Sequence, residues 1–408
     1  MTTGTVYDLV VIGGGAVGLS TAYHAAGRQW RTLVIEQFGF LNDQGSSAGA
    51  SRQFRVQYSQ HYMSELALSA IPFWNDIQRY SSDLLKGHGG SLWFGDPALS
   101  SQEGGIQAAM NTMDSLGIAY TALANAAAIE SAYPFRGLPS DYSGFFQPDG
   151  GIINLKATER ALFQGAEATG PVEFHDQETV IGISSVEGGV IEVTTDKATY
   201  TTQKLAITPG PYVNVVLAHL GLSVDIEIWE MSSAYYRKTD PQLVLPTWFV
   251  FQEPQNTSLY YGFPEVDWAH PGYIRVAPDI PDKILTDPSQ RNPDPSEKSL
   301  GYNEAWVRDH MMGLDSTSEF TSTCLIALSS GAETKELLLD YAPGSVPNAQ
   351  SIVTYSAGWA AKFIPILGEM ICQMLADEYL QYFEFGDYRI DRSNFAINWG
   401  GPDTAKER

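Results

Sequence analysis

The sequence predicts an α/β protein with two domains, and three observations support this prediction. The chain has 408 residues, more than a single hydrophobic core usually holds. Its first 36 residues follow the order strand, glycine-rich turn, helix, strand. Two later stretches, "SSAYYRKT" and "SLYYGFP", are rich in aromatic and β-branched residues and indicate strands of an antiparallel sheet.

The first element is an apolar strand over residues 7–12, and Gly13, Gly15 and Gly18 follow it as G-x-G-x-x-G. A helix and a second strand come next, and the second strand ends on Glu36. In this arrangement the glycines allow a tight turn, close approach of a diphosphate and close helix packing, while the acid accepts ribose hydroxyls. Glycine-rich turns also occur without a ligand, but the ordered set of elements favours a Rossmann-type dinucleotide site.

Composition excludes several classes of protein. Hydrophobic residues make up 44% and charged residues 17%, which is typical of a globular chain. The net charge of −23 disfavours nucleic acid and anionic membranes as partners. Two cysteines, no signal-peptide pattern and no 18-residue apolar span predict a soluble cytoplasmic protein. The seven histidines show no metal-ligand spacing, so we expect no metal site. The pattern "GSSAG" follows a loop rather than a strand, which argues against a serine hydrolase.

Beyond Glu36 the sequence resembles the family of monomeric sarcosine oxidase and N-methyltryptophan oxidase, within the D-amino-acid-oxidase superfamily. Segments that resemble the family follow in its order: "QGSSAGASRQFRVQYSQHYM", "GFFQPDGGIINLKATERAL", "KLAITPGPYVN", "LYYGFP", Cys324 and "YSAGWAAKFIPILGE". The resemblance implies FAD as cofactor and a Rossmann-type FAD-binding domain interleaved with an antiparallel-sheet substrate domain. The implied boundaries are 1–85, 145–225 and 320–395 for the FAD-binding domain, 86–144 and 226–319 for the substrate domain, and 396–408 for a tail.

The resemblance also implies roles for individual residues. Arg55 falls at the position that clamps the substrate carboxylate, Lys362 at a lysine that assists it, and Tyr261 at a tyrosine over the substrate. Arg52 falls at a basic residue beside the flavin ring. A guanidinium fork suits a carboxylate on physical grounds as well. The remaining cofactor-binding positions that the motif or the resemblance implies are Ala16, Val17, Ser46, Val180, Gly210, Gly358 and Ala361. Arg52 and Lys362 belong both to this set and to the catalytic residues.

Cys324 falls at the cysteine that forms a thioether to the flavin 8α-methyl group in the family. Its neighbourhood differs from the family's, however, because Ile326 replaces a tyrosine and the run beyond it is longer. Two interpretations therefore stay open: covalent attachment of FAD, or a buried strand cysteine. The second cysteine, Cys372, lies in an apolar run where a buried thiol is the ordinary expectation.

Other departures concern the substrate side. Arg275 takes the position of the family's oxygen-activating lysine, and Asp279 that of a histidine. Ser47 and Ala48 replace paired histidines, and Trp359 stands in the glycine-rich turn, either for packing or to receive a bulkier substrate. Arginine and lysine differ in shape and hydration, so the exchange is not neutral.

The resemblance thus implies a monomeric FAD-dependent oxidase of the C–N bond of an amino acid, with an N-methyl or cyclic secondary amino acid favoured. Hydride would pass to flavin N5, and O2 would reoxidise the flavin and give H2O2. The departures leave open primary L-amino acids, a biosynthetic imine precursor, and a dehydrogenase that uses another acceptor. A catalytically silent flavoprotein is the alternative from a different class.

Overall fold

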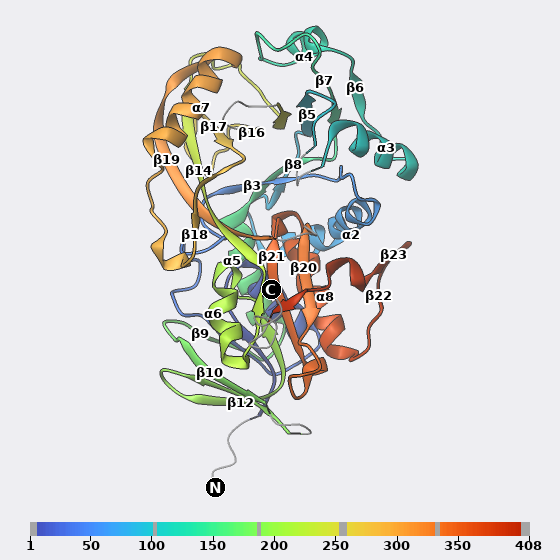
Figure 1. Cartoon of the computed structure of the whole chain (residues 1–408), viewed down its shortest axis with the longest axis vertical. Helices are drawn as coiled ribbons and strands as arrows, with labels where there is room; N and C mark the ends of the chain where they lie inside the picture. Colours follow the sequence, from blue (N-terminus) through green and yellow to red (C-terminus); the bar gives the residue numbers. More distant parts are fainter. Residues whose placement is uncertain (1–5, 101–103, 186–188, 253–258, 331–334, 401–408) are drawn as a thin grey trace.

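The computed structural model describes residues 6–100, 104–185, 189–252, 259–330 and 335–400. Two large sheets dominate it (Figure 1): an eight-stranded sheet in the lower half of the view and a nine-stranded sheet in the upper half. Helices pack against both sheets. The predicted class, an α/β protein that combines a Rossmann-type unit with an antiparallel sheet, is confirmed, and one pair of neighbouring strands in the second sheet runs parallel.

The eight-stranded sheet contains five parallel strands in the order β9–β2–β1–β12–β21. The antiparallel strand β20 lies beside β21, and the hairpin β10–β11 pairs with the first half of β12. The central strands are buried on both faces, as a sheet covered by helices requires. The strands are β1 (Val6–Ile12), β2 (Thr32–Ile35), β9 (Val172–His175), β10 (Val180–Ser185), β11 (Ile191–Thr195), β12 (Thr199–Ile207), β20 (Leu337–Tyr341) and β21 (Ile352–Gly358).

Three helices form the layer next to this sheet: α1 (Ala16–Gly27) packs between α5 (Leu155–Thr169) and α8 (Ile364–Ala376). Small residues make the close packing possible. A Cβ on Gly368 would lie 2.3 Å from the backbone of Ser20, so only glycine fits there. The helix α2 (His61–Ile77) packs against α8. This layer fixes the N-terminus of α1 relative to the rest of the lower unit.

The nine-stranded sheet has the order β18–β14–β17–β16–β15–β5–β7–β6, and β19 pairs with the other edge of β14. Helix α7 (Glu297–His310) packs on it, on the outer side in Figure 1. The stretches "SSAYYRKT" and "SLYYGFP" do lie in strands, in β14 and β16. The strands are β5 (Ser91–Gly95), β6 (Thr121–Leu123), β7 (Ser143–Gln147), β14 (Ile226–Lys238), β15 (Thr247–Phe251), β16 (Leu259–Phe263), β17 (Tyr273–Pro278), β18 (Pro281–Leu285) and β19 (Leu314–Ser329).

The long strands β14 and β19 join the two halves of the molecule. They pair antiparallel from Ile226 with Ser329 to Lys238 with Leu314, so their far ends reach the lower unit. A three-stranded sheet of β3 (Ser51–Phe54), β8 (Gly151–Asn154) and β4 (Lys86–Gly87) lies between the large sheets. Strands from distant parts of the chain therefore meet where the two units join.

The remaining elements are small. Strand β13 pairs with β24, and β22 pairs with β23. Residues 401–408 of the expected tail lie outside the described residues, and the expected domain boundaries stay a prediction. The elements are α3 (Ile106–Leu116), α4 (Ala126–Ala132), α6 (Val213–Leu217), β13 (Ser223–Val224), β22 (Tyr382–Phe385), β23 (Tyr388–Asp391) and β24 (Trp399–Gly400).

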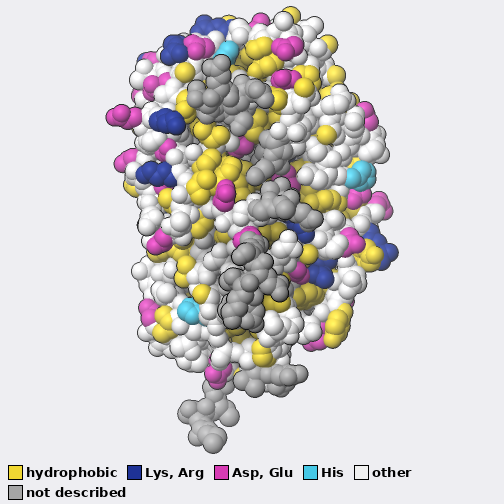
Figure 2. Space-filling view, in the orientation of Figure 1, with side chains coloured by type: hydrophobic (Ala, Val, Ile, Leu, Met, Phe, Trp, Pro, Cys, Tyr) yellow, Lys and Arg dark blue, Asp and Glu magenta, His cyan; other side chains and the backbone are white. Residues whose placement is uncertain are grey.

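Acidic side chains are scattered over the face shown in Figure 2 rather than gathered in one patch. Within the described ranges, no helix is both long and apolar enough to span a membrane. In the same part of the chain, no group of three His, Cys, Asp or Glu side chains is placed to hold a metal ion.

Candidate active site

A large cavity lies where the glycine-rich turn, the loop after β2, the strands β3, β16, β17 and β19, and the turn after β21 come together. The structure brings nearly all the sequence-predicted site residues to this one cavity, and only Gly18 is absent from its lining. The predicted residues that line it are Gly13, Gly15, Ala16, Val17, Glu36, Ser46, Arg52, Arg55, Val180, Gly210, Tyr261, Arg275, Cys324, Gly358, Ala361 and Lys362.

The glycine-rich turn is shaped by backbone contacts that exclude side chains. Gly13 has a φ of 102°, and a Cβ there would lie 2.6 Å from the carbonyl oxygen of Thr208. A Cβ on Gly18 would lie only 1.9 Å from the carbonyl oxygen of Gly13. Gly18 therefore holds the helix against the turn, which explains why it does not line the cavity. Backbone N–H groups at the start of α1 face the cavity as a result.

Glu36 lies at the end of β2 and is 6% exposed. Its carboxylate accepts hydrogen bonds from the backbone N–H groups of Gly14 and Phe38, at 2.8 Å each. Burial raises the pKa of this carboxyl, while the backbone hydrogen bonds act in the opposite direction. Each oxygen accepts one of these bonds and keeps room for a second, so the carboxylate can also accept a ribose hydroxyl.

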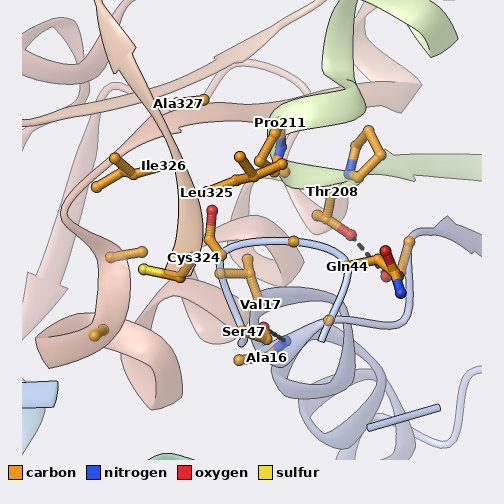
Figure 3. A pocket seen from close by; sticks show the side chains of 18 of the residues that line it. Ala16, Val17, Gln44, Ser47, Thr208, Pro211, Cys324, Leu325, Ile326 and Ala327 are labelled. Atoms are coloured by element: carbon orange, nitrogen blue, oxygen red, sulfur yellow. Dashed lines mark hydrogen bonds between the residues drawn. The ribbon is translucent and has the colours of Figure 1, made fainter. Parts of the chain in front are cut away.

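These features fit the dinucleotide part of FAD. The helix N-terminus and the glycine-rich turn suit a diphosphate, and the buried acid at the end of the second strand suits a ribose. Figure 3 shows Ala16 and Val17 at the start of α1 beside Ser47, with Leu325, Ile326 and Ala327 from β19 in the same cavity. The cavity thus extends from the Rossmann turn toward the nine-stranded sheet.

Arg52 stabilises the loop that follows β2. Its guanidinium donates hydrogen bonds to three backbone carbonyls: Ser51 at 2.7 Å, Ser46 at 2.8 Å and Ala48 at 2.6 Å. The loop is therefore tied to the start of β3, next to the cavity. Arg52 thus lies at the cavity wall, where the resemblance expects a basic residue.

Arg55 and Lys362 are buried cations at the other end of the cavity, 2% and 6% exposed. The guanidinium carbon of Arg55 lies 4.5 Å from the centre of the Tyr58 ring, and Nζ of Lys362 lies 5.9 Å from the same ring centre. Arg55 also lies 5.0 Å from the Trp93 ring. Two buried cations around one aromatic ring make this end of the cavity suited to an anion.

Tyr261 and its neighbours form an aromatic wall on the nine-stranded sheet. The ring of Tyr261 stacks on Phe249 with 6.3 Å between centroids and contacts Phe263 edge-on at 5.7 Å. Burial raises the pKa of the Tyr261 hydroxyl, so it is neutral at physiological pH. Arg275 lies beside this wall, 4.7 Å from the Phe263 ring, and donates a hydrogen bond to the carbonyl of Ser51 at 3.0 Å.

Cys324 lies in β19, opposite Met231 of β14, and is partly exposed to the cavity (Figure 3). The residue before it is fixed by Arg291, which donates hydrogen bonds to the hydroxyl and the carbonyl of Thr323. Cys372 lies in a different environment: it is fully buried in α8, and its thiol contacts a backbone carbonyl of α1. Only the first cysteine faces the space that would hold a cofactor.

Sequence reasoning missed Glu159, Phe249 and Arg291. Phe249 and Arg291 carry no local signal, because their partners are distant in the chain. Glu159 did carry one: it lies on the apolar face of α5, between Leu155 and Leu162 at helical spacing. A charged residue in such a position needs a partner or a function.

Comparisons with known proteins agree with this geometry. Residues 8–374 match the family model "DAO: FAD dependent oxidoreductase". The solved structure of NikD, described as an unusual amino acid oxidase essential for nikkomycin biosynthesis, is 36% identical, with a TM-score of 0.87 over 97% of this chain and 98% of that chain.

Curated relatives give the same result. Human peroxisomal sarcosine oxidase is 23% identical over 95% of this chain and 96% of its own, and N-methyl-L-tryptophan oxidase of Citrobacter koseri is 24% identical over 95% and 99%. A Dictyostelium discoideum protein whose name includes the words bifunctional amine oxidase is 31% identical over 96% of this chain. This chain spans only 37% of that protein's length.

The family match over most of the chain, the cavity that fits FAD and the aligned relatives lead to one assignment. The chain belongs to the FAD-dependent oxidoreductases of the D-amino-acid-oxidase superfamily, in the sarcosine-oxidase-like family that acts on amines.

Proposed function

We propose that the protein oxidises the C–N bond of an amino acid whose carboxylate is bound by Arg55 and Lys362. The observation that carries the proposal is this pair of buried cations around the Tyr58 ring, in a protein with 47 acidic and 24 basic residues. A planar guanidinium and an ammonium on one side of a cavity match the charge and shape of a carboxylate, and a carboxylate is the anion that every amino acid supplies.

The chain's residues bind and orient the substrate. Arg55 and Lys362 hold the carboxylate, and the wall of Phe249 and Tyr261 covers the carbon skeleton and excludes water. FAD, when bound, supplies the acceptor for the substrate hydride and the means of passing electrons to oxygen. The amine is expected to react in its neutral form, because a neutral nitrogen can share its lone pair as the C–H bond breaks.

An N-methyl or cyclic secondary amino acid is the favoured substrate. The relatives named sarcosine oxidase and N-methyl-L-tryptophan oxidase act on amines of this kind by their names. The NikD structure is described as that of an unusual amino acid oxidase essential for a biosynthesis, so an amino acid from a biosynthetic route is supported as well. A biosynthetic imine precursor is the alternative substrate. Primary L-amino acids are the third class to test.

Oxygen is the proposed acceptor, with H2O2 as product, and Arg275 is the proposed cation for its reduction. The side chain is 6% exposed, lines the cavity and carries a fixed charge beside Phe263. A fixed positive charge stabilises the superoxide that forms first when oxygen takes an electron. Because arginine replaces the family's lysine here, a dehydrogenase that uses another acceptor is the second candidate.

We further propose that Cys324 forms the thioether to the flavin 8α-methyl group. Its support is the cavity-facing position in β19 and the anchoring of the adjacent Thr323 by Arg291. The expected monomeric state and cytoplasmic location are kept as predictions alongside it.

The experiment that tests the function mixes the purified yellow protein anaerobically with a panel of amino acids and follows flavin bleaching. The panel contains sarcosine and other N-methyl amino acids, L-proline and L-pipecolate, and primary L-amino acids. Bleaching by a secondary amino acid supports the proposal. A flavin that no amine reduces would instead indicate a flavoprotein that binds a ligand without oxidising it. Peroxide release under air then separates an oxidase from a dehydrogenase, since dye reduction without peroxide identifies the latter.

A further inference from the structure

Glu159 is a buried acid in the wall of the cavity that none of the steps above uses. It lies on α5 and is 1% exposed, yet it lines the cavity together with Ser47. Its carboxyl contacts the ammonium of Lys156 through Oε2, and Ser47 is its other polar neighbour. Because each carboxyl oxygen can take part in more than one hydrogen bond, a buried carboxyl that borders a ligand cavity can also contact the ligand.

The cation nearest to Glu159 is shared with other groups. Nζ of Lys156 lies 3.2 Å from Oε2 of Glu159 and 3.0 Å from Oδ1 of Asp43. The same ammonium donates hydrogen bonds to the carbonyls of Leu41 and Asn42, at 3.1 and 2.9 Å. Lys156 therefore ties the loop after β2 to α5. Its single positive charge is shared between the carboxyls of Asp43 and Glu159.

Of the elements that pack on α5, β3 carries Arg52, whose guanidinium donates hydrogen bonds to the carbonyls of Ser46 and Ala48 on either side of Ser47. The tyrosines of α1 and of the turn after α2 lie further from Glu159. Tyr23 of α1 and Tyr80, which follows α2, lie against Gly165, six residues further along α5. Tyr23 is hydrogen bonded to Asp76 there, and Tyr80 to Thr169. The charged groups that act on Glu159 are Lys156 and Asp43.

Ser47 connects this acid to the N-terminus of α1. Its Oγ accepts a hydrogen bond from the backbone N–H of Ala16 at 3.1 Å, as Figure 3 shows. This N–H belongs to the first turn of the helix, where a diphosphate binds in dinucleotide sites. Glu159 therefore lies beside the group that borders the expected diphosphate.

Burial raises the pKa of Glu159 to about 7, and the charge of Asp43 adds to the rise, while Lys156 and Ser47 lower it. The carboxyl is therefore poised to be neutral or ionised near physiological pH. An ionised carboxyl beside the doubly charged diphosphate would repel it. A neutral carboxyl can instead donate its O–H to an oxygen acceptor of the cofactor.

We propose that Glu159 is a cofactor-binding residue whose neutral carboxyl donates a hydrogen bond to the diphosphate region of FAD, next to Ser47. FAD then binds together with a proton, and its affinity falls as the pH rises. The inference concerns FAD binding alone and does not depend on which amino acid is oxidised.

The test uses the Cys324→Ala protein, in which FAD is held without a covalent bond, freed of flavin and titrated with FAD between pH 6 and 8.5. We expect the dissociation constant to rise by up to tenfold per pH unit above pH 7. Calorimetry at pH 8 in phosphate and in Tris, buffers of different ionisation enthalpy, should show uptake of up to one proton per FAD. The added variant Glu159→Gln, which carries a neutral side chain at every pH, should keep the pH 6 affinity and flatten the profile.

Glu167→Gln is the matched control, since this acid lies on the exposed face of the same helix. It should retain the pH profile of the parent protein. Parallel profiles for the Glu159→Gln and parent proteins would overturn the inference, and so would a parent protein that binds FAD without proton uptake. The uptake measurement needs no Glu159 variant, so a misfolded variant leaves the question decidable. No amine is present in any titration, so failure here is distinct from failure of the proposed oxidation.

Discussion

Replacing Arg55 by methionine should lower the efficiency of flavin reduction by an amino acid about a hundredfold. Methionine keeps most of the volume between the Tyr58 and Trp93 rings but removes the charged fork. Truncating one partner of a buried, hydrogen-bonded charge pair costs about 2–5 kcal/mol. Because Lys362 still offers a cation beside the same ring, we take a value in the lower half of this range, about 3 kcal/mol. Each 1.36 kcal/mol corresponds to a factor of about ten in rate, which gives the hundredfold loss.

The assay is anaerobic stopped-flow measurement of flavin reduction as a function of substrate concentration. Each amino acid is paired with the amine that lacks its carboxylate, for example L-proline with pyrrolidine. The loss in Arg55→Met should appear with the amino acid and be nearly absent with the amine. Lys86→Met is the control, because Lys86 also lies over an aromatic ring, Phe54, but outside the cavity lining. An equal loss for amino acid and amine, in a variant that melts like the parent, would refute the carboxylate role.

Three further predictions address the cofactor and the fold. Gly18→Ala should abolish FAD retention and lower the free energy of unfolding by about 2–3 kcal/mol, because its Cβ meets a backbone carbonyl at 1.9 Å. The control is Gly27→Ala, because an added Cβ there has no atom within 4 Å. It should change neither the FAD absorbance nor the melting behaviour. Acid precipitation should leave the yellow colour in the pellet for the parent protein and in the supernatant for Cys324→Ala; colour in the supernatant for both would make this thiol a plain strand residue. Burial favours the neutral form of Glu369, but hydrogen bonds and charges from His24 of α1 and from Arg28, which follows that helix, hold its pKa well below the ordinary value. Its contribution is therefore complete above about pH 4.3 and is lost progressively as the pH falls toward the depressed pKa of the folded state, so Glu369→Gln should cost roughly 2 kcal/mol at pH 7 and less at pH 3. The exposed Glu378→Gln should change neither value, as denaturant titrations at both pH values would show.

The parts of the fold that the sequence predicted are those encoded within short stretches of chain. The apolar strand, the glycine spacing and Glu36 all fall within one unit, and each has a local physical reason that a reader of the sequence can apply. The position of Cys324 within a strand was predicted in the same way and is confirmed. The arrangement of the cavity required more, because residues from β3, β16, β19 and the turn after β21 meet only through pairing of distant strands.

What the sequence did not predict are contacts between side chains and backbone that are distant in the chain. Arg291 reaches Thr323 and the carbonyl of Asp43, which is 248 residues away. No periodicity or motif encodes such a pair. Glu159 is an intermediate case, since its place on an apolar helix face marked it as unusual but did not indicate what it faces.

The two ends of the cavity are lined differently: backbone atoms limit the space at the cofactor end, and side chains on strands form the end proposed to bind the substrate. At the cofactor end the limiting contacts are made by backbone atoms, as at Gly13, where any added side chain would meet a carbonyl. A single substitution changes a side chain but leaves the course of the backbone in place. Few substitutions are therefore compatible with the contacts at the cofactor end. At the substrate end the surfaces are side chains on strands, as with Phe249 and Tyr261, whose rings meet each other rather than backbone.

Side-chain surfaces can be exchanged one residue at a time while the strands keep their pairing. Arg275 is an example: the resemblance places it where a lysine is expected, and it lies in a regular strand, β17, paired with β14 and β16. The same scaffold can therefore keep its cofactor and acquire another substrate. It follows that substitutions at Phe249 or Arg275 should alter which amines reduce the flavin while the flavin remains bound, whereas substitutions in the glycine-rich turn should remove the flavin first.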